Sequence, residues 1–144
     1  MAVDDESCSG YFEAEVFTGR GEGGFYVSIY ARKFREKLGF TPYPGTLNTR
    51  ILDGRAAALF NECLKRAESR YIEPPQIEGA RLGAVIAYRA VINDLKAWIV
   101  RPLITFYKDD VVEFISEIYL RGALNLKDGD RVKIRVQVSR YRTA

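Results

Sequence analysis

The chain has 144 residues, a net charge of +3 and 47% hydrophobic residues, which suffices for one domain with its own core. No apolar run approaches the ~18 residues that span a bilayer, and the acidic N-terminus does not resemble a signal peptide, so we expect a cytoplasmic protein. Because the chain has no histidine, any catalysis must use carboxylates, lysine, arginine, hydroxyls, backbone amides or a hard cation.

The N-terminal segment 1–10 is expected to be a flexible tail, and residues 11–144 are expected to form a single domain. Two cysteines, Cys8 and Cys63, are too few for a disulfide scaffold and are wrongly spaced for a zinc site. We therefore expect free thiols, with a bridge between the two as the less favoured alternative.

In the first half of the chain, the patterns predict a strand at 11–17, a glycine loop, and a second strand at 25–30. In the second strand, side chains alternate with the period of two that is typical of a half-buried strand. Three elements follow in order: a short helix at 31–38 stopped by Gly39, a strand at 46–52, and a helix at about 55–66 with Asp53 as its N-cap.

In the second half of the chain, the patterns predict mostly strands. The predicted elements are strands at 82–92, 96–100, 111–116 and 131–138, a turn at Asn93-Asp94, a short helix at 118–124, and a turn at 127–130. About six to eight short strands, few helices and no sustained βαβ rhythm indicate a mainly β fold, a closed β-barrel with a few inserted short helices.

The glycine loop has four glycines in six residues, Gly19-Arg20-Gly21-Glu22-Gly23-Gly24. Its glycines formally match a dinucleotide-binding pattern, but that pattern needs a helix directly after the loop. Because a strand is predicted there, we reject the Rossmann interpretation. The loop instead resembles a hairpin tip that folds over phosphates, since glycines let several backbone N–H groups approach phosphate oxygens. The alternative is a mobile hairpin without a ligand.

A second motif, Pro44-Gly45-Thr46-Leu47-Asn48, follows a predicted turn. Thr46 and Asn48 are two residues apart, so in an extended segment their side chains project to the same side. Magnesium prefers oxygen ligands and keeps waters and substrate phosphates, so two neutral protein ligands can suffice. The alternative is that both side chains only make local hydrogen bonds.

Glu113 lies inside the apolar run 111–115. A carboxylate at this strand-internal position could accept a proton from a substrate hydroxyl. The alternative is that Val112 and Phe114 form the core face of the strand, in which case Glu113 faces water.

With these pieces placed, the chain resembles the archaeal CTP-dependent riboflavin kinases from about residue 11 to residue 138. The matching segments are Gly19-Arg20-Gly21-Glu22-Gly23, Leu38-Gly39-Phe40, Pro42-Tyr43, Gly45-Thr46-Leu47-Asn48, Arg101-Pro102, Thr105, Glu113 and 124–130.

The resemblance implies a closed six-stranded cradle-loop β-barrel that transfers the γ-phosphate of CTP to the ribityl 5′-hydroxyl of riboflavin, giving FMN and CDP with Mg²⁺. It implies magnesium binding by Thr46 and Asn48, flavin contact by Thr105 and Glu113, and catalysis by Glu113. It also implies that the nucleotide is bound by Gly19, Arg20, Gly21, Glu22, Gly23 and Gly24 and by Ile118, Tyr119, Leu120 and Arg121.

Two other functions are compatible with the sequence. The first is a regulatory barrel that binds a nucleotide or flavin without turnover. The second is a nucleic-acid-binding barrel that uses Arg131, Lys133, Arg135, Arg140, Arg142 and Tyr141. That basic stretch is more typical of a solvated strand face and tail, so we expect no nucleic-acid or membrane partner. No pattern determines the oligomeric state, and a monomer is compatible with the sequence.

Overall fold

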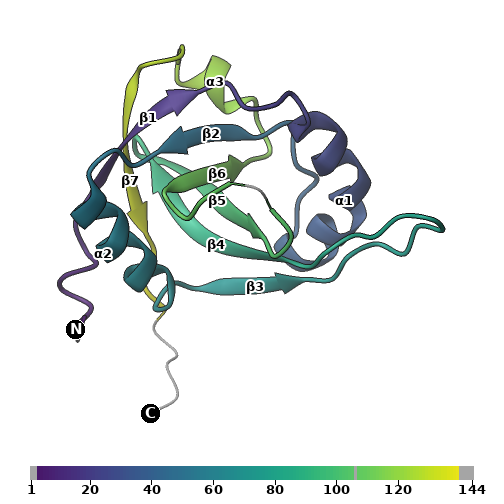
Figure 1. Ribbon diagram of the computed structural model, residues 1–144, viewed down its shortest axis with the longest axis horizontal. Helices are drawn as coiled ribbons and strands as arrows, with labels where there is room; N and C mark the ends of the chain where they lie inside the picture. Colours follow the sequence, from purple (N-terminus) through teal and green to yellow (C-terminus); the bar gives the residue numbers. More distant parts are fainter. Residues whose placement is uncertain (1–2, 106, 140–144) are drawn as a thin grey trace.

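The computed structural model describes residues 3–105 and 107–139, and within them the chain forms a closed barrel of antiparallel strands (Figure 1). The strands follow one another around the barrel in the order β4 (Val85–Ile92), β5 (Leu95–Pro102), β6 (Val111–Ile115), β2 (Leu47–Arg50), β1 (Phe12–Phe17) and β7 (Arg131–Val136). Pairing of β4 with β7 closes the ring. The expected mainly β, closed six-stranded barrel is therefore confirmed.

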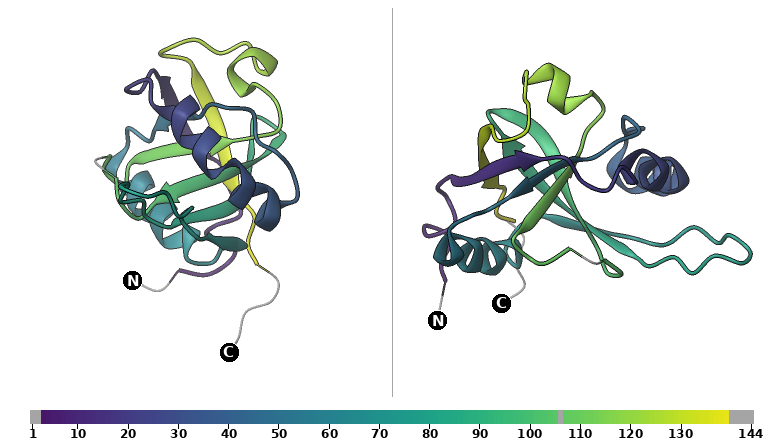
Figure 2. Two further views of the ribbon diagram at one scale, coloured as in Figure 1. Left: turned by 90° about the vertical axis from the view of Figure 1, so that its right-hand side faces the viewer. Right: turned by 45° about the horizontal axis from the view of Figure 1, so that its top comes forward.

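A seventh strand, β3 (Ser69–Ile72), pairs only with β4, outside the ring. The sequence patterns did not predict it, because it is short and its side chains are mostly exposed or half-buried. The connection from β3 to β4 projects away from the barrel as a long arm (Figure 2).

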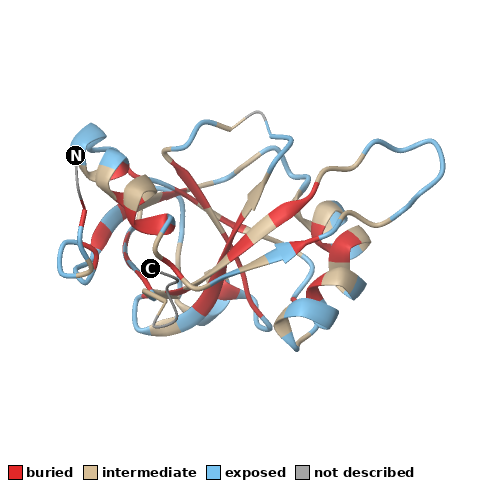
Figure 3. Ribbon diagram, turned by 90° about the horizontal axis from the view of Figure 1, so that it is seen from below, coloured by how far each residue is buried: buried red, intermediate tan, exposed pale blue. Residues whose placement is uncertain are grey.

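Two helices cover the barrel at different places. Helix α2 (Gly54–Leu64) packs its buried side chains into the barrel core, together with inward-facing residues such as Phe114 and Ile134. Helix α1 (Gly23–Leu38) lies against the outer face of β3 to β6 and forms a second core with residues such as Trp98. Figure 3 shows the buried side of each helix turned toward the strands. The sheet is thus covered by apolar side chains on both faces where α1 lies.

The start of α1 contradicts the predicted strand at 25–30, because these residues are helical. Val27, Tyr30 and Phe34 are buried at the spacing i, i+3 and i+7, which is the stripe of a helix that packs on a sheet. A run of six residues that are mostly apolar fits periods of 2 and 3.6 almost equally well, so the local pattern could not separate them. The predicted helix at 31–38 is the second half of α1.

Several local predictions are confirmed. The Asp53 side chain accepts hydrogen bonds from the N–H groups of Arg55 and Ala56, as an N-cap should. Asn93 and Asp94 both have positive φ angles, of 45° and 67°, in the two-residue turn between β4 and β5. The third helix, α3 (Leu120–Ala123), lies within the short helix that was predicted at 118–124.

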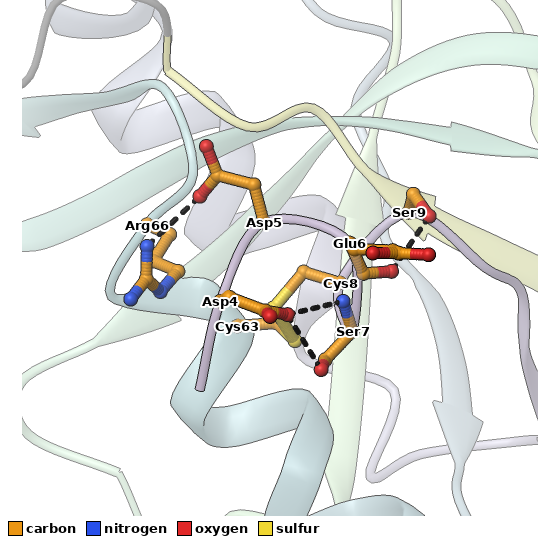
Figure 4. Close-up of a disulfide and its surroundings, with 8 residues drawn as sticks. All are labelled: Asp4, Asp5, Glu6, Ser7, Cys8, Ser9, Cys63 and Arg66. Atoms are coloured by element: carbon orange, nitrogen blue, oxygen red, sulfur yellow. Dashed lines mark hydrogen bonds and ion pairs between the residues drawn. A yellow bond between two sulfur atoms is a disulfide. The ribbon is translucent and has the colours of Figure 1, made fainter. Parts of the chain in front are cut away.

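The two cysteines form a disulfide, so the expectation of free thiols is wrong (Figure 4). Cys8 and Cys63 are 55 residues apart in sequence, and both are fully buried. Residues 3–10, expected as a flexible tail, lie along α2, where Asp5 pairs with Arg66 at 2.8 Å. Only this packing brings the two sulfur atoms together, and no local spacing in the sequence reports it.

In the described ranges, no helix is both long and apolar enough to cross a membrane.

Candidate functional site

The site is built on one row of the sheet. Asn48 in β2 lies opposite Glu113 in β6, which in turn lies opposite Val100 in β5. Residues directly opposite in antiparallel strands project to the same face. Val100 belongs to the core under α1, so this row faces α1 and not the interior of the barrel.

This register decides between the two alternatives for Glu113. Val112 and Phe114 are buried in the barrel interior, so Glu113 does lie on the opposite face of β6. That face, however, is covered by α1 and by the loop after β5, and Glu113 is half-buried at the wall of a pocket. The alternative was therefore right that Val112 and Phe114 form the core face of the strand. It was wrong that Glu113, on the other face, is exposed to water.

The glycine loop leads from β1 directly into α1, so the predicted hairpin is wrong. Glu22 is the N-cap residue of α1, and it makes no capping hydrogen bond with its side chain. The first N–H groups of a helix have no partner within the helix, and the helix dipole favours an anion beside them. The loop therefore presents a helix N-terminus to the pocket instead of a hairpin tip.

The Rossmann interpretation remains excluded, although the reason changes. A helix does follow the glycine loop, as the dinucleotide pattern requires. Within the described part of the chain, the strand before the loop, β1, pairs with β2 and β7, both antiparallel, whereas a Rossmann unit needs parallel strands joined by the helix.

Two glycines allow the loop to lie directly on the Thr46–Asn48 segment. A Cβ atom on Gly19 would lie 2.2 Å from Asn48 Nδ2, and one on Gly23 would lie 2.6 Å from Thr46 Oγ1. Neither position has room for a side chain unless these polar groups move. The loop and the Thr46–Asn48 motif, separated in sequence, thus form one continuous surface.

Thr46 and Asn48 project to the same side, as their spacing predicted. Thr46 Oγ1 and Asn48 Oδ1 are 3.2 Å apart, and this end of the Asn48 amide also lies 3.2 Å from Glu113 Oε1. With the oxygen on this side, three oxygen atoms converge, which is the donor set that a hard cation prefers. With the amide turned over, its nitrogen donates to Thr46 and Glu113, while its oxygen accepts from Gly19 N–H.

A pocket of about 240 Å³ joins most of the predicted site residues. Those that line it are Arg20, Gly21, Glu22, Gly23, Thr46, Asn48, Thr105 and Glu113. Gly19 and Gly24 are not among the residues that line it, but Gly19 N lies 3.2 Å from the Asn48 amide, and a Cβ atom on Gly24 would lie 3.1 Å from the Pro44 carbonyl oxygen. A neighbouring pocket of about 200 Å³ shares Pro102, Thr105, Tyr107 and Glu113 with the first, so Glu113 lines both spaces.

The segment Ile118–Arg121 is not part of this pocket. All four residues line a smaller pocket of about 40 Å³, which shares Thr46 with the larger one. The structure therefore places the two predicted nucleotide-binding segments on either side of Thr46.

Burial dominates the electrostatics of the site. It raises the pKa of the Glu113 carboxyl to about 7, and the nearby Arg101 guanidinium opposes part of this rise. Arg101 is held in place by Asn61 and by the Asp109 carbonyl, to which it donates a hydrogen bond of 2.7 Å. A carboxylate with a raised pKa is better suited to accept a proton than an exposed one.

Sequence reasoning missed four residues that line the main pocket: Tyr26, Pro102, Ile104 and Tyr107. Tyr26 was predicted to lie on a strand, which concealed its position in the first turn of α1, where it lines the same pocket as Glu113. Ile104 and Tyr107 belong to the loop between β5 and β6, where no periodic pattern exists. Pro102 carried a weak signal as part of the Arg101-Pro102 motif, to which no role was assigned.

The basic strand β7 faces solvent with every second side chain. Arg131 pairs with Glu13 at 2.8 Å and with Glu15 at 3.4 Å, and Arg135 lies over the Tyr11 ring. Arg140, Tyr141 and Arg142, which the nucleic-acid alternative also required, lie outside the described residues.

The family model and three relatives that match this chain all carry the name riboflavin kinase. A family model for CTP-dependent riboflavin kinase, described as a domain of unknown function, DUF120, matches residues 16–136. A riboflavin kinase of Aeropyrum pernix is 52% identical over 128 residues, covering 88% of this chain and 96% of that protein.

Two further riboflavin kinases, from Archaeoglobus fulgidus and Pyrococcus abyssi, are each 44% identical to this chain. The matches cover 86% and 89% of this chain, but only 53% and 59% of those proteins. The chain thus spans nearly all of one relative and little more than half of the others.

Proposed function

The chain belongs to the CTP-dependent riboflavin kinase family, and from this premise we propose that it transfers the γ-phosphoryl group of CTP to the ribityl 5′-hydroxyl of riboflavin, with Mg²⁺, giving FMN and CDP. One observation carries the proposal most strongly. The glycine loop, the Thr46–Asn48 pair and Glu113 come from three separate parts of the chain and meet at one pocket.

The glycine loop and the start of α1 would bind the donor phosphates through backbone N–H groups, with residues 19–24 as the binding segment. Support comes from the uncapped helix N-terminus and from the close packing of Gly19 and Gly23 on their neighbours. The segment 118–121 would bind the rest of the nucleotide, since it lines the small pocket on the other side of Thr46.

Thr46 and Asn48 would hold the magnesium ion, and the oxygen atoms at this corner fit a hard cation. When bound, the ion would neutralise negative charge on the β- and γ-phosphates of the donor. Because Asn48 can also turn its nitrogen toward Glu113, we expect the amide to change its orientation between the metal-free and metal-bound states.

Glu113 would act on the acceptor. As the 5′-oxygen attacks the γ-phosphorus, a new P–O bond forms, the bond to the β-phosphate oxygen breaks, and Glu113 takes the proton of the hydroxyl. Thr105 would contact the flavin from the second pocket, where its hydroxyl accepts a hydrogen bond from Tyr107 N–H at 3.2 Å. Positioning and electrostatics supply most of the catalysis in such a reaction.

The test is a riboflavin phosphorylation assay with CTP, ATP, GTP and UTP, each with Mg²⁺ and with EDTA, followed as FMN by chromatography. FMN that forms preferentially with CTP and disappears in EDTA would support the donor, the reaction and the metal requirement. FMN with ATP instead would retain the kinase and contradict the donor. Absence of FMN with all four donors, from folded protein, would favour a non-catalytic nucleotide- or flavin-binding barrel.

Replacing Asn48 with alanine is expected to lower kcat on the order of 100-fold and to raise the Mg²⁺ concentration for half-maximal rate at least about tenfold, because one cation ligand is lost. Asn48→Asp is the chemical control, since it retains an oxygen ligand and should keep a Mg²⁺ requirement closer to that of the wild type. A magnesium titration of Asn48→Ala that overlays the wild-type curve would contradict the assignment.

We further propose that residues 11–144, together with residues 3–10 that the Cys8–Cys63 disulfide joins to the core, form the catalytic domain and that it acts in the cytoplasm, as a monomer without nucleic acid or membrane. The family match at 16–136 lies inside these bounds. The Cys8–Cys63 disulfide does not contradict this location, because disulfides do occur in intracellular proteins, above all in those of hyperthermophiles. Size-exclusion chromatography with light scattering would test the monomer.

A further inference from the structure

Tyr26 has a buried hydroxyl that the fold does not use. It lies in the first turn of α1, where its N–H bonds to the Glu22 carbonyl, and its ring packs against those of Tyr30 and Phe34. The residue lines the main pocket together with Glu113. Among the described residues, its hydroxyl oxygen is inaccessible to solvent and has no hydrogen-bond partner.

A buried hydroxyl without a partner typically destabilises a protein by about 1–3 kcal/mol, and phenylalanine would fill the same space without that cost. Tyr30, one turn later on the same helix, shows the usual arrangement. Its hydroxyl donates to the Gly83 carbonyl at 2.6 Å and so has a structural partner. The contrast indicates that the Tyr26 hydroxyl serves something other than the folded chain.

The surroundings of Tyr26 make its hydroxyl a hydrogen-bond donor. Burial is the main effect that raises the pKa of this phenol, and the negative charge of the Glu113 carboxylate raises it further. The phenol therefore keeps its proton at neutral pH. Tyr26 shares the lining of the main pocket with Glu113 and with Gly21 and Gly23 at the start of α1.

We propose that Tyr26 is a further catalytic residue: when the substrates fill the pocket that its side chain lines, a rotation of this side chain brings the buried hydroxyl to an oxygen of the phosphoryl group, to which it donates a hydrogen bond during the transfer. This inference rests on the proposed kinase activity. The phosphoryl oxygens carry no proton and can only accept, so a donor between Glu113 and the glycine loop is complementary to them. The ribityl hydroxyl is the poorer partner, because a hydrogen bond donated to the attacking oxygen withdraws electron density from it and makes it a weaker nucleophile.

The chemistry of the step is unchanged by this contact. The 5′-oxygen forms the new bond to phosphorus, the bond to the CDP oxygen breaks, and the hydroxyl proton passes to Glu113. Tyr26 keeps its own proton and only stabilises the charge on the group in transit.

The experiment compares Tyr26→Phe with Tyr30→Phe, which differ by one helical turn and each remove a single oxygen atom. Steady-state rates with CTP and riboflavin are measured for both variants and the wild type, along with thermal unfolding of the substrate-free proteins. For Tyr26→Phe we expect a kcat lower by about 10- to 100-fold, an unchanged KM for riboflavin, and a Tm equal to or above that of the wild type. For Tyr30→Phe we expect a lower Tm and an unchanged kcat.

Each other result overturns the inference. A kcat of Tyr26→Phe within twofold of the wild type would show that the hydroxyl has no role in the reaction. A higher KM for riboflavin at unchanged kcat would assign the hydroxyl to the flavin and not to the phosphoryl group. Equal losses of kcat and Tm in both variants would indicate a structural role. An inactive wild type would overturn the proposed function and this inference together, whereas the other results leave the kinase intact.

Discussion

Replacing Glu113 with glutamine is expected to lower kcat about 100-fold or more while the protein stays folded. Glutamine has nearly the same shape but cannot accept the proton of the ribityl hydroxyl, and general-base catalysis typically contributes a factor of this size. The measurement is the steady-state rate of FMN formation at saturating CTP, riboflavin and Mg²⁺, with folding checked by circular dichroism.

Glu117→Gln is the matched control, because Glu117 lies just after β6, is exposed, and does not line the main pocket. Its kcat should remain within about twofold of the wild type. A Glu113→Gln variant that keeps a third or more of the wild-type kcat would refute the role of Glu113 as the base.

The same Glu113→Gln variant is expected to be more stable than the wild type at pH 8 in metal-free protein kept in EDTA. The pKa of this carboxyl is about 7 in the folded state, raised by burial above its ordinary value of 4.5. Below both values the carboxyl is protonated in either state and has no effect. Between them the unfolded state loses the proton first, so the wild type loses stability as the pH rises, up to about pH 7.

Thermal unfolding at pH 4, 6 and 8 would measure this difference. The Tm advantage of Glu113→Gln should be smallest at pH 4, grow at pH 6 and be largest at pH 8. An advantage that is the same at all three values would contradict the buried, ionisable position of the carboxyl.

Breaking the disulfide is expected to have the second large effect, this time on stability. For the 55-residue separation of Cys8 and Cys63, the chain-entropy account gives a loss of about 4 kcal/mol in the free energy of unfolding. For a chain of this length that corresponds to a fall in Tm of about 10 °C or more. Scanning calorimetry with and without a reductant would measure it.

The double variant Cys8→Ala/Cys63→Ala supplies the control, since a reductant should not lower its Tm further. The turnover of the reduced protein, assayed well below its Tm, should match that of the oxidised protein, because neither cysteine lines the main pocket. If the reductant leaves the wild-type Tm unchanged, the bridge contributes nothing to stability.

Much of the barrel could be predicted because its signals are local. The alternation of apolar and charged residues along β7 reports a strand with one buried face, whatever its neighbours are. Asp53 caps the turn that it begins, and Asn93-Asp94 supplies the positive φ angles of its own hairpin. In each case the side chains that favour the local structure belong to the same short segment that adopts it.

At the glycine loop the local pattern predicted the wrong element, a strand at 25–30 instead of a helix. The expectation that the loop binds phosphates came from its glycines and did not depend on that element. Its glycines indicated a close approach to phosphates, but whether a strand or a helix follows depends on which face packs against the sheet. Val27, Tyr30 and Phe34 become a buried stripe only because β3 to β6 present an apolar outer face. The helix, in turn, changes how phosphates would be held, from a hairpin tip to a helix N-terminus.

By itself, then, the sequence determined the strand faces, the caps and turns, the spacing that puts Thr46 beside Asn48, and the glycines that permit close packing. Only the tertiary structure decided that Glu113 lies under α1 instead of in water, that Cys8 meets Cys63, and that Tyr26 lines the pocket while its hydroxyl is buried without a partner among the described residues. The physical reason is the distance along the sequence over which each effect acts. Periodicity and turn chemistry act within a few residues, whereas burial and proximity depend on segments that the chain brings together from far apart.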